Sequence, residues 1–279
     1  MQLGDIDFLI IGATKSATTW LQRSLQSDDD VYMPDPELHY FSREYHRGVG
    51  WYLSQFGEPG PGRVVGEKSN SYLDEPPAAQ RIHEALPHVK LIAQLRNPVD
   101  RAYSNYCMLY RRGEVGADIE RYLDPADAVD LRILDGGHYS RHIRAYLDLY
   151  PRERLLVLIY EKLKLDPLDQ LNAARRFLGL APVPALPIAG KIKDKTTPMI
   201  GRRMRRYLAR LKPLVAPLRE TTAFKYVHRL AAHEITHPVL PPGLRDRLID
   251  YYEVDNRKLA DLIGHDLAPW LTSTRKNTA

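Results

Sequence analysis

Lys15 and three hydroxyl side chains stand close together near the start of the chain, in a pattern suited to binding an anion. The hydroxyls belong to Ser16, Thr18 and Thr19, and an apolar run at 8–11 precedes them. A turn that joins a buried strand to a helix leaves backbone N–H groups free, and the helix dipole adds partial positive charge there. These residue types therefore predict a phosphate cradle. The alternative is an ordinary strand–turn–helix connection whose serine and threonine cap the helix.

The spacing of this loop differs from that of the Walker loop, GxxxxGK[ST], which binds nucleotide triphosphates with magnesium. Lys15 comes three residues after Gly12, and the second glycine is missing. A P-loop-type kinase is therefore the weaker enzymatic interpretation of the loop.

A carboxylate and an imidazole form a second group of candidates, in a segment rich in proline. Pro34 and Pro36 preclude a helix here and hold the backbone extended. Glu37 and His39 are two residues apart, so in an extended segment their side chains share one side. The alternative is a surface loop with an incidental acid.

Lys68 is a third candidate, because it follows a short predicted strand at 64–65. Open α/β sheets place their ligands at the carboxyl ends of strands, which favours a functional role for polar residues there. The alternative is that Glu67 and Lys68 pair with each other in a surface ion pair of little energetic consequence.

Arg96 ends the clearest predicted strand, 89–95, and Ser104 lies about two turns into the helix that follows. A guanidinium group at such a strand tip, near a hydroxyl, can bind a phosphate through two parallel hydrogen bonds. The alternative is an ion pair between Arg96 and a carboxylate such as that of Asp100.

The elements that position these residues alternate between strand and helix, which predicts an α/β fold with a parallel sheet flanked by helices. Its first strand, loop and helix form a P-loop-like unit. Apolar spacing predicts strands at 8–11, 31–33, 64–65, 89–95 and 155–160, and helices at 50–56, 78–86, 98–111, 139–150, 168–178 and 243–263.

The composition sets limits on the class of protein. The chain has 279 residues, of which 44% are hydrophobic and 27% charged, as in ordinary globular proteins. The single cysteine, Cys107, excludes an internal disulfide framework and suits a reducing compartment. No apolar stretch approaches the ~20 residues of a transmembrane helix, and the first predicted strand begins within a few residues of Met1. These features predict a cytoplasmic protein.

Basic charge is concentrated in one segment. Residues 191–229 carry twelve lysines and arginines against Asp194 and Glu220, a local charge of +10 that leaves −5 for the remainder of a chain with net charge +5. A module that binds anions or nucleic acid through this segment is one interpretation, although few aromatic residues are present for base stacking and nucleic acid is disfavoured. A solvated face, a cover over an acceptor groove and peripheral contact with an anionic membrane are the others.

Three separated stretches together resemble the PAPS-dependent sulfotransferases, with the heparan-sulfate-type carbohydrate branch in a bacterial-like cytosolic form as the nearest match. PAPS is 3′-phosphoadenosine 5′-phosphosulfate. Gly12–Thr19 resembles the family's 5′-phosphosulfate loop, Gly66–Tyr72 its EKS/EKT segment and Leu95–Tyr106 its 3′-phosphate motif. The similarity covers most of 6–180. Ala17 is a departure, because the family usually has glycine there, and alanine is strained wherever φ is positive.

The resemblance implies a donor site for PAPS and its product PAP that needs no metal. Lys15 contacts the transferring sulfuryl group and the leaving phosphate. The loop residues Ser16, Ala17, Thr18 and Thr19 hold the 5′-phosphate. Arg96 and Ser104 bind the 3′-phosphate.

The resemblance also implies that Glu37 is the general base that takes the proton from an acceptor hydroxyl. His39 is the alternative base, because some branches of the family use histidine. Lys68 lies near the sulfuryl group or the acceptor. The acceptor is expected to be a carbohydrate or another small hydroxylated molecule, and the oligomeric state is left open.

The second half of the chain departs from the heparan-type pattern, which has a disulfide-bounded loop over the 3′-phosphate. We expect Lys193, Lys195 or Arg202 to take over that contact. The predicted organisation is a single sulfotransferase domain, 1–279, made of three parts: a core, a basic and partly helical lid segment, and a C-terminal helix, at 6–180, 190–240 and 243–263.

Overall fold

A five-stranded parallel sheet forms the centre of the computed structural model, which describes residues 1–188, 199–200, 232–233 and 236–272. The strand order is β2-β3-β1-β4-β5, and every neighbouring pair is parallel. A separate antiparallel pair, β6–β7, lies later in the chain. The strands are β1 Phe8–Gly12, β2 Val31–Tyr32, β3 Val64–Lys68, β4 Lys90–Leu95, β5 Leu155–Ile159, β6 Met199–Ile200 and β7 Ala232–His233.

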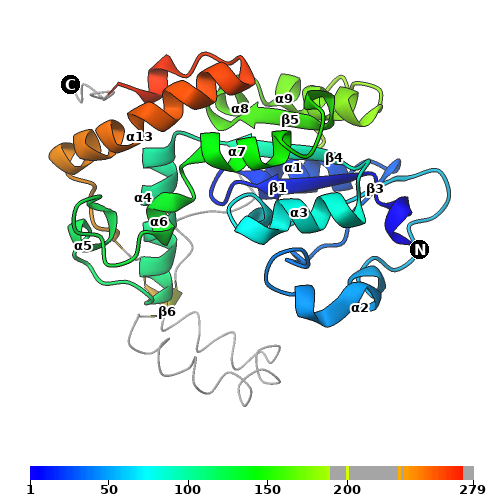
Figure 1. Cartoon of the computed structure of the whole chain (residues 1–279), viewed down its shortest axis with the longest axis horizontal. Coiled ribbons are helices and arrows are strands. Elements are labelled where there is room, and N and C mark those ends of the chain that lie inside the picture. Colours follow the sequence, from blue (N-terminus) through cyan, green and yellow to red (C-terminus); the bar gives the residue numbers. More distant parts are fainter. Residues whose placement is uncertain (189–198, 201–231, 234–235, 273–279) are drawn as a thin grey trace.

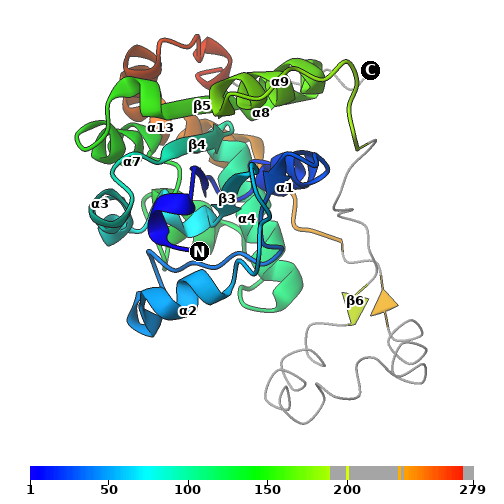
Figure 2. The same cartoon turned by 90° about the vertical axis from the view of Figure 1, so that its right-hand side faces the viewer.

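Helices cover both faces of the five-stranded sheet. Figure 2 shows the sheet between α3 and α7 on one side and α1 and α9 on the other. The described helices are α1 Thr18–Gln26, α2 Gly48–Ser54, α3 Pro76–Ala85, α4 Pro98–Arg112, α5 Glu120–Leu123, α6 Arg132–Asp135, α7 Tyr139–Leu147, α8 Tyr160–Leu165, α9 Pro167–Leu178 and α13 Pro242–Ile263.

The alternation of side chains along β1 builds a separate core on each face. Leu9 and Ile11 belong to the core beneath α3 and α7, whereas Phe8 and Ile10 belong to the core beneath α1 and α9. All four are fully buried. A strand buried on both faces reads as a continuous apolar run, which is why the segment 8–11 could be recognised in the sequence.

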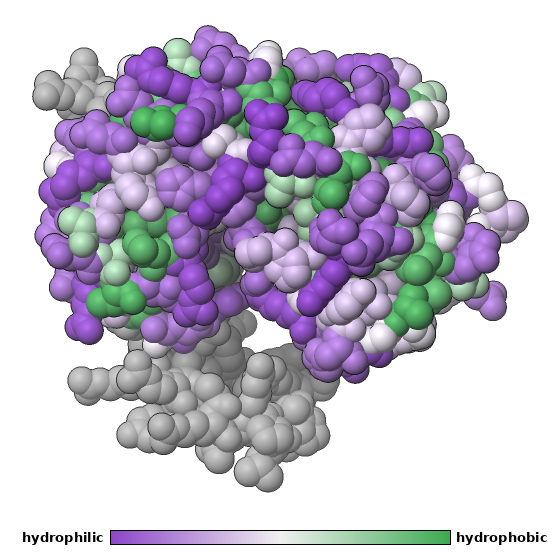
Figure 3. All heavy atoms as spheres, viewed as in Figure 1, coloured by the Kyte–Doolittle hydropathy of each residue, from purple (hydrophilic) through white to green (hydrophobic). Residues whose placement is uncertain are grey.

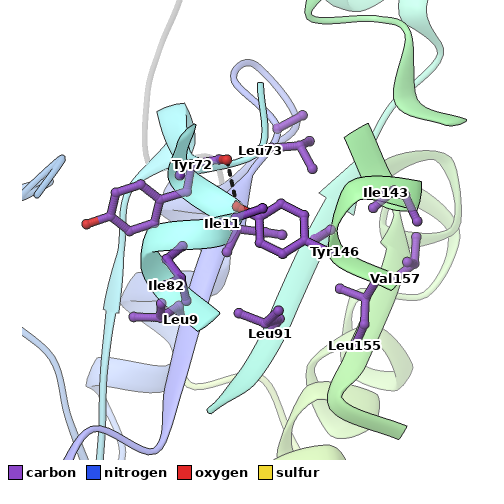
Figure 4. Packing of buried hydrophobic residues seen from close by; sticks show 14 of the residues in the cluster. Leu9, Ile11, Tyr72, Leu73, Ile82, Leu91, Ile143, Tyr146, Leu155 and Val157 are labelled. Atoms are coloured by element: carbon purple, nitrogen blue, oxygen red, sulfur yellow. Dashed lines mark hydrogen bonds between the residues drawn. The ribbon is translucent and has the colours of Figure 1, made fainter. Parts of the chain in front are cut away.

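Figure 4 shows the core under α3 and α7 from close by. Ile82 of α3, Ile143 of α7 and Leu91 of β4 all belong to this cluster, with Ile82 beside Leu9 and Ile143 beside Val157. The buried hydroxyl of Tyr146 donates a hydrogen bond of 2.7 Å to the carbonyl of Tyr72. This bond fastens α7 to the segment that follows β3, so the core also fixes a loop at the carboxyl edge of the sheet.

A third cluster lies beside the sheet, where α13 packs against α4, α5 and α6 (Figure 1). Tyr106 of α4 and Tyr252 of α13 are both fully buried in it. Arg101 of α4 is also buried, and its Nη2 donates to the carbonyl of Ile133. These contacts hold α4, and therefore the loop that joins it to β4, in a fixed position beside the sheet.

The predicted fold class is confirmed, and the differences lie at element boundaries and in a short helix. β3 runs on through Lys68, because the polar residues 66–68 continue to pair with β1. The sequence pattern ended this strand two residues after it began, since a glycine and two charged residues follow. The short helix α8, directly after β5, was not predicted. The C-terminal end of α13 agrees with prediction, because Gly264 follows it in the left-handed conformation at φ 66°.

The visible surface carries mainly hydrophilic side chains, with hydrophobic ones in small separate groups (Figure 3). Within the described part of the chain, no helix is both long and apolar enough to cross a bilayer.

Gly12, at the end of β1, is a tightly packed backbone position at the carboxyl edge of the sheet. Its φ is +149°, and a Cβ placed there would lie 2.8 Å from Cβ of Leu73 and 2.9 Å from the carbonyl oxygen of Asn70. Both neighbours belong to the loop after β3, so only glycine lets the loops after β1 and β3 approach this closely.

We therefore expect Gly12→Ala to lower the free energy of unfolding by at least ~2 kcal/mol, from backbone strain and overpacking together. Urea denaturation followed by circular dichroism measures the change. Gly50→Ala is the matched control, because nothing lies within 4 Å of a Cβ at that helical glycine. Equal stabilities for the two variants would contradict the close approach described here.

Candidate active site

The candidate residues gather where neighbouring parallel strands end. β3, β1 and β4 are adjacent in the sheet, so the segments that follow Lys68, Gly12 and Leu95 emerge side by side. The chain leaves β1 toward one edge of the sheet and later continues on the other side of β1, at β4. Such a switch in strand order opens a crevice at the carboxyl ends, where α/β proteins bind their ligands.

The loop between β1 and α1 is fastened at both of its ends to Gln94 of β4. The N–H of Ala13 donates to the carbonyl of Gln94 at 2.8 Å, and Nε2 of Gln94 donates to the carbonyl of Ser16 at 2.6 Å. Lys15 and Ala17 both have positive φ, 71° and 67°. The expectation of left-handed strain at Ala17 is thus confirmed, since this residue precedes α1 in that conformation.

Arg96 reaches from the tip of β4 to the loop after β1. Its Nη1 donates to the carbonyl of Lys15 at 3.2 Å, and its guanidinium lies 4.8 Å from the ring centroid of Tyr160. Its Nε is buried, and no described residue bonds to it. The alternative pairing with Asp100 is wrong, because that carboxylate accepts from Arg245 at 2.7 Å.

Tyr160 is a site residue that sequence reasoning missed. It is the first residue of α8, directly after β5, and β5 is the neighbour of β4. Its place at the end of a strand was the available signal, but a tyrosine at the end of an apolar run reads as part of the strand.

Two further predicted phosphate ligands lie on the helices that follow β1 and β4. Ser104 is buried on α4 with 7% of its surface exposed. Thr19 is half-buried in the first turn of α1. Lys193, Lys195 and Arg202 lie outside the described residues, as does most of the basic segment.

Glu37 is the centre of a network of donors. Its Oε1 accepts from Nζ of Lys68 at 2.6 Å and from Nδ2 of Asn70 at 3.1 Å, and its Oε2 accepts from the backbone N–H of Asn70 at 3.2 Å. Nε2 of His39 lies 3.6 Å from Oε2, so the two side chains share one side as predicted. The interpretation of Lys68 as half of a surface pair with Glu67 is wrong, because Lys68 is buried and pairs with Glu37.

The charges around Glu37 set its protonation. Burial alone would raise the pKa of Glu37. The ammonium group of Lys68 and the hydrogen bonds from Lys68 and Asn70 lower it by more than that, so the net pKa is below the ordinary value. Burial also lowers the pKa of His39, despite the nearby carboxylate of Glu37. The carboxylate is therefore ionised and the imidazole neutral at neutral pH.

Asn70 is the second residue that sequence reasoning missed. Besides its two contacts with Glu37, its Oδ1 accepts from Oγ1 of Thr18 at 2.7 Å. It therefore connects the first turn of α1 with the carboxylate. The sequence placed Asn70 in a polar stretch after a strand, but nothing in the residue type distinguished it from its neighbours.

A buried carboxyl group lies behind the network. Glu67 of β3 is fully buried, and it accepts from the hydroxyls of Tyr72 at 2.6 Å, Ser69 at 2.8 Å and Tyr52 at 3.3 Å. Oγ of Ser69 in turn accepts from the backbone N–H of His39 at 2.8 Å. Burial raises the pKa of Glu67 to about 7, although the hydrogen bonds that it accepts lower the pKa. This residue supports the segment that carries the candidate bases.

Comparison with known proteins gives concordant matches. The family described as "Sulfotransferase domain" matches residues 5–191. Human heparan sulfate glucosamine 3-O-sulfotransferase 6 is 29% identical over 265 residues, which cover 92% of this chain and 72% of that protein. The bifunctional heparan sulfate N-deacetylase/N-sulfotransferase of Drosophila melanogaster is 30% identical over 209 residues, 63% of this chain but only 20% of that protein's length.

The structural comparison agrees. The crystal structure of a sulfotransferase from Alicyclobacillus acidocaldarius matches with a TM-score of 0.71 and 25% identity, covering 96% of this chain and 99% of that one.

The strained position in the loop makes a testable prediction. Ala17→Gly should raise the free energy of unfolding by roughly 0.5–1 kcal/mol, because relief of the left-handed strain exceeds the entropy that glycine adds to the unfolded chain. Urea denaturation measures this change. The control is Ala145→Gly, at an exposed position of the regular helix α7, which should be destabilised by about 1 kcal/mol. Destabilisation in both variants would argue against strain at Ala17.

The raised pKa of Glu67 predicts a specific dependence of the free energy of unfolding on pH. Burial raises its pKa from 4.5 to about 7, so between these values the folded protein holds a proton that the unfolded chain has released. Its contribution to stability is fully present below about 4.5 and is lost as the pH rises through about 7.

Glu67→Gln cannot ionise, so its stability relative to wild type should increase by about 2 kcal/mol from pH 5 to pH 8. Urea denaturation at the two pH values provides the measurement. Glu84→Gln on the exposed side of α3 serves as the control and should show no such increase. A difference between Glu67→Gln and wild type that is the same at both pH values would rule out the raised pKa.

Proposed function

This chain belongs to the sulfotransferase family and is a sulfotransferase enzyme, and we propose that it moves a sulfuryl group from PAPS to a hydroxyl of a carbohydrate or other small hydroxylated acceptor. The observation that carries the proposal is the carboxylate of Glu37, which pairs with Lys68 and is connected by hydrogen bonds through Asn70 to Thr18 at the start of α1. A proton acceptor and an anion-binding loop thus meet at one edge of the sheet.

The two ends of PAPS call for two anion sites, and the residues present fit both. Lys15, Ser16, Thr18 and Thr19 with the N-terminus of α1 form the site for the 5′-phosphosulfate. Arg96 and Ser104 form the site for the 3′-phosphate. The Nε of Arg96 is buried and has no partner among the described residues, which supports this assignment, because a guanidinium group whose donors are not all used can turn toward a phosphate.

The side chains divide the chemistry between them. Glu37 accepts the proton of the acceptor hydroxyl while the acceptor oxygen forms its bond to sulfur. The bond between sulfur and the bridging phosphate oxygen breaks, and the electron pair stays on the phosphate of PAP. Lys15 and the N–H groups of the loop stabilise that negative charge, and Lys68 the equatorial oxygens, as in other in-line transfers.

Glu37 is preferred to His39 as the base on its geometry. Nδ1 of His39 is 2.7 Å from Oγ of Ser71, which leaves only Nε2 for another partner, and that atom faces Glu37. A base must reach the hydroxyl proton directly or through one water molecule, and a carboxylate keeps lone pairs for this even when it accepts from a lysine.

The acceptor class rests on the relatives. The human relative is named for glucosamine of heparan sulfate, which supports a sugar hydroxyl as the acceptor. The kinase alternative is not proposed, because the family is that of sulfotransferases. Closure by Lys193, Lys195 or Arg202, the single-domain organisation and the cytoplasmic location stay predictions.

The proposal is tested with PAP and PAPS. Isothermal titration calorimetry should show that the wild-type protein binds PAP, and mass spectrometry should show one added sulfuryl group on an acceptor in a panel of glucosamine-containing oligosaccharides and phenols. Lys15→Ala should weaken PAP binding and transfer together. Glu37→Gln should retain PAP binding and lose ~10²–10⁴-fold in turnover, the usual contribution of a general base.

Two exposed substitutions, Lys258→Ala and Glu84→Gln, are the matched controls and should change neither measurement. Wild-type protein that fails to bind PAP would contradict the donor assignment. Near-normal turnover in Glu37→Gln beside an inactive His39→Ala would transfer the role of base to His39.

A further inference from the structure

Asn70 contacts both the proposed donor loop and the proposed base. Its Oδ1 accepts the hydroxyl hydrogen bond of Thr18 at 2.7 Å, and its Nδ2 donates to Oε1 of Glu37 at 3.1 Å. Thr18 is 3% exposed, so this connection is shielded from water on the loop side.

The chemistry of the three groups fixes the direction of each hydrogen bond. The pKa of Glu37 lies below its ordinary value, because the ammonium of Lys68 and the hydrogen bonds it receives outweigh the effect of burial, so its carboxylate only accepts. The NH₂ group of Asn70 must then face Glu37, and its carbonyl oxygen must face Thr18. The hydroxyl of Thr18 is therefore the donor in its bond to Asn70.

A hydroxyl group has one proton to donate, and this limits what Thr18 can do. Phosphate oxygens without a proton only accept, so Thr18 must turn its proton away from Asn70 in order to bond a donor phosphate. The carbonyl of Asn70 then loses its partner. If the amide rotates so that its NH₂ group meets the oxygen of Thr18, Glu37 loses one of its hydrogen-bond donors.

We propose that Asn70 is a positioning residue that couples occupancy of the donor loop to the release of Glu37. Without bound PAPS or PAP, Asn70 and Lys68 hold the carboxylate. When the 5′-phosphate takes the hydroxyl proton of Thr18, the side-chain amide of Asn70 stops donating to Glu37, which keeps the hydrogen bonds from Lys68 and from the backbone N–H of Asn70. This inference rests on the proposed function, which assigns Thr18 to the donor phosphate and Glu37 to the acceptor proton. It adds an order to the reaction, in which the base is freed after the donor is bound.

The other charged groups around Glu37 point in the same direction. Lys68 forms an ion pair with Glu37 at 2.6 Å, and in the proposed function its ammonium group contacts the sulfuryl oxygens instead. His39 faces the carboxylate from 3.6 Å and is neutral at neutral pH, while Glu67 lies behind the network and interacts with Glu37 as a like charge. Loss of the hydrogen bond from the Asn70 side-chain amide and weakening of the ion pair with Lys68 both raise the basicity of Glu37.

The test follows the carboxyl group itself and needs no acceptor. In protein labelled with ¹³C at the glutamate carboxyl, the Glu37 resonance is assigned as the one missing from Glu37→Gln. Its pKa is then measured with and without saturating PAP, over the pH range in which the protein stays folded. We expect PAP to raise the pKa of Glu37 in the wild-type protein.

The negative charge of the PAP phosphates raises the pKa of Glu37 in the wild type and in every variant. Two variants separate this effect from that of the hydrogen bonds that run from Thr18 through Asn70 to Glu37. Asn70→Ala should show a raised pKa of Glu37 already without PAP, and a smaller further rise with PAP than the wild type. Its Kd for PAP should not rise, because in this variant the binding of PAP no longer breaks a hydrogen bond between Thr18 and Asn70. Thr18→Val, nearly the same in shape, should bind PAP more weakly and also show a smaller rise at saturation.

The matched control is Gln80→Ala, which removes an amide that donates to the carboxylate of Glu84 at 2.9 Å on the exposed side of α3. It should leave the titration of Glu37 unchanged. Failure of the wild-type protein to bind PAP would overturn the proposed function. Binding of PAP with no change in the pKa of Glu37, or with an equal rise in wild type and Thr18→Val, would overturn only the coupling. Thr18→Val keeps this test available even if Asn70→Ala does not fold.

Discussion

The ion pair between Lys68 and Glu37 is the interaction on which the site depends. Lys68 ends a strand inside the sheet and has only 3% of its side chain exposed, so its ammonium group needs a counter-charge. That charge comes from the segment after β2, which must fold back across the carboxyl end of β3 to bring Glu37 within 2.6 Å. Removing Glu37 would leave the ammonium group of Lys68 buried and uncompensated.

Parallel pairing then gathers the remaining groups. Because β3, β1, β4 and β5 run in the same direction, their carboxyl ends deliver Lys68, Gly12, Arg96 and Tyr160 to one edge. Each strand contributes one or two residues, and none of the loops could form the arrangement alone. The buried carboxyl of Glu67 adds a second layer, which holds the backbone of the segment carrying the candidate bases through Ser69.

The sequence was sufficient to predict the parallel α/β fold and the position of the loop between the first strand and the first helix, because apolar periodicity and the types of residue at strand ends are local properties. It also placed Glu37 and His39 on one side, from their spacing alone. It could not identify Asn70 or Tyr160, whose roles arise from contacts across 52 or more positions of the chain, Asn70 to Thr18 and Tyr160 to Arg96. The same reason explains why Lys68 was paired with its neighbour Glu67 as an alternative.

The contacts that hold the loop after β1 bear on how quickly and how tightly a ligand can bind. Gln94 and Arg96 both fasten its carbonyl groups to β4, and the two left-handed residues Lys15 and Ala17 are fixed by the folded chain itself. The conformational entropy of ordering this loop is therefore lost when the protein folds and not when a ligand arrives. Association then requires less rearrangement, so more of the interaction energy remains as affinity.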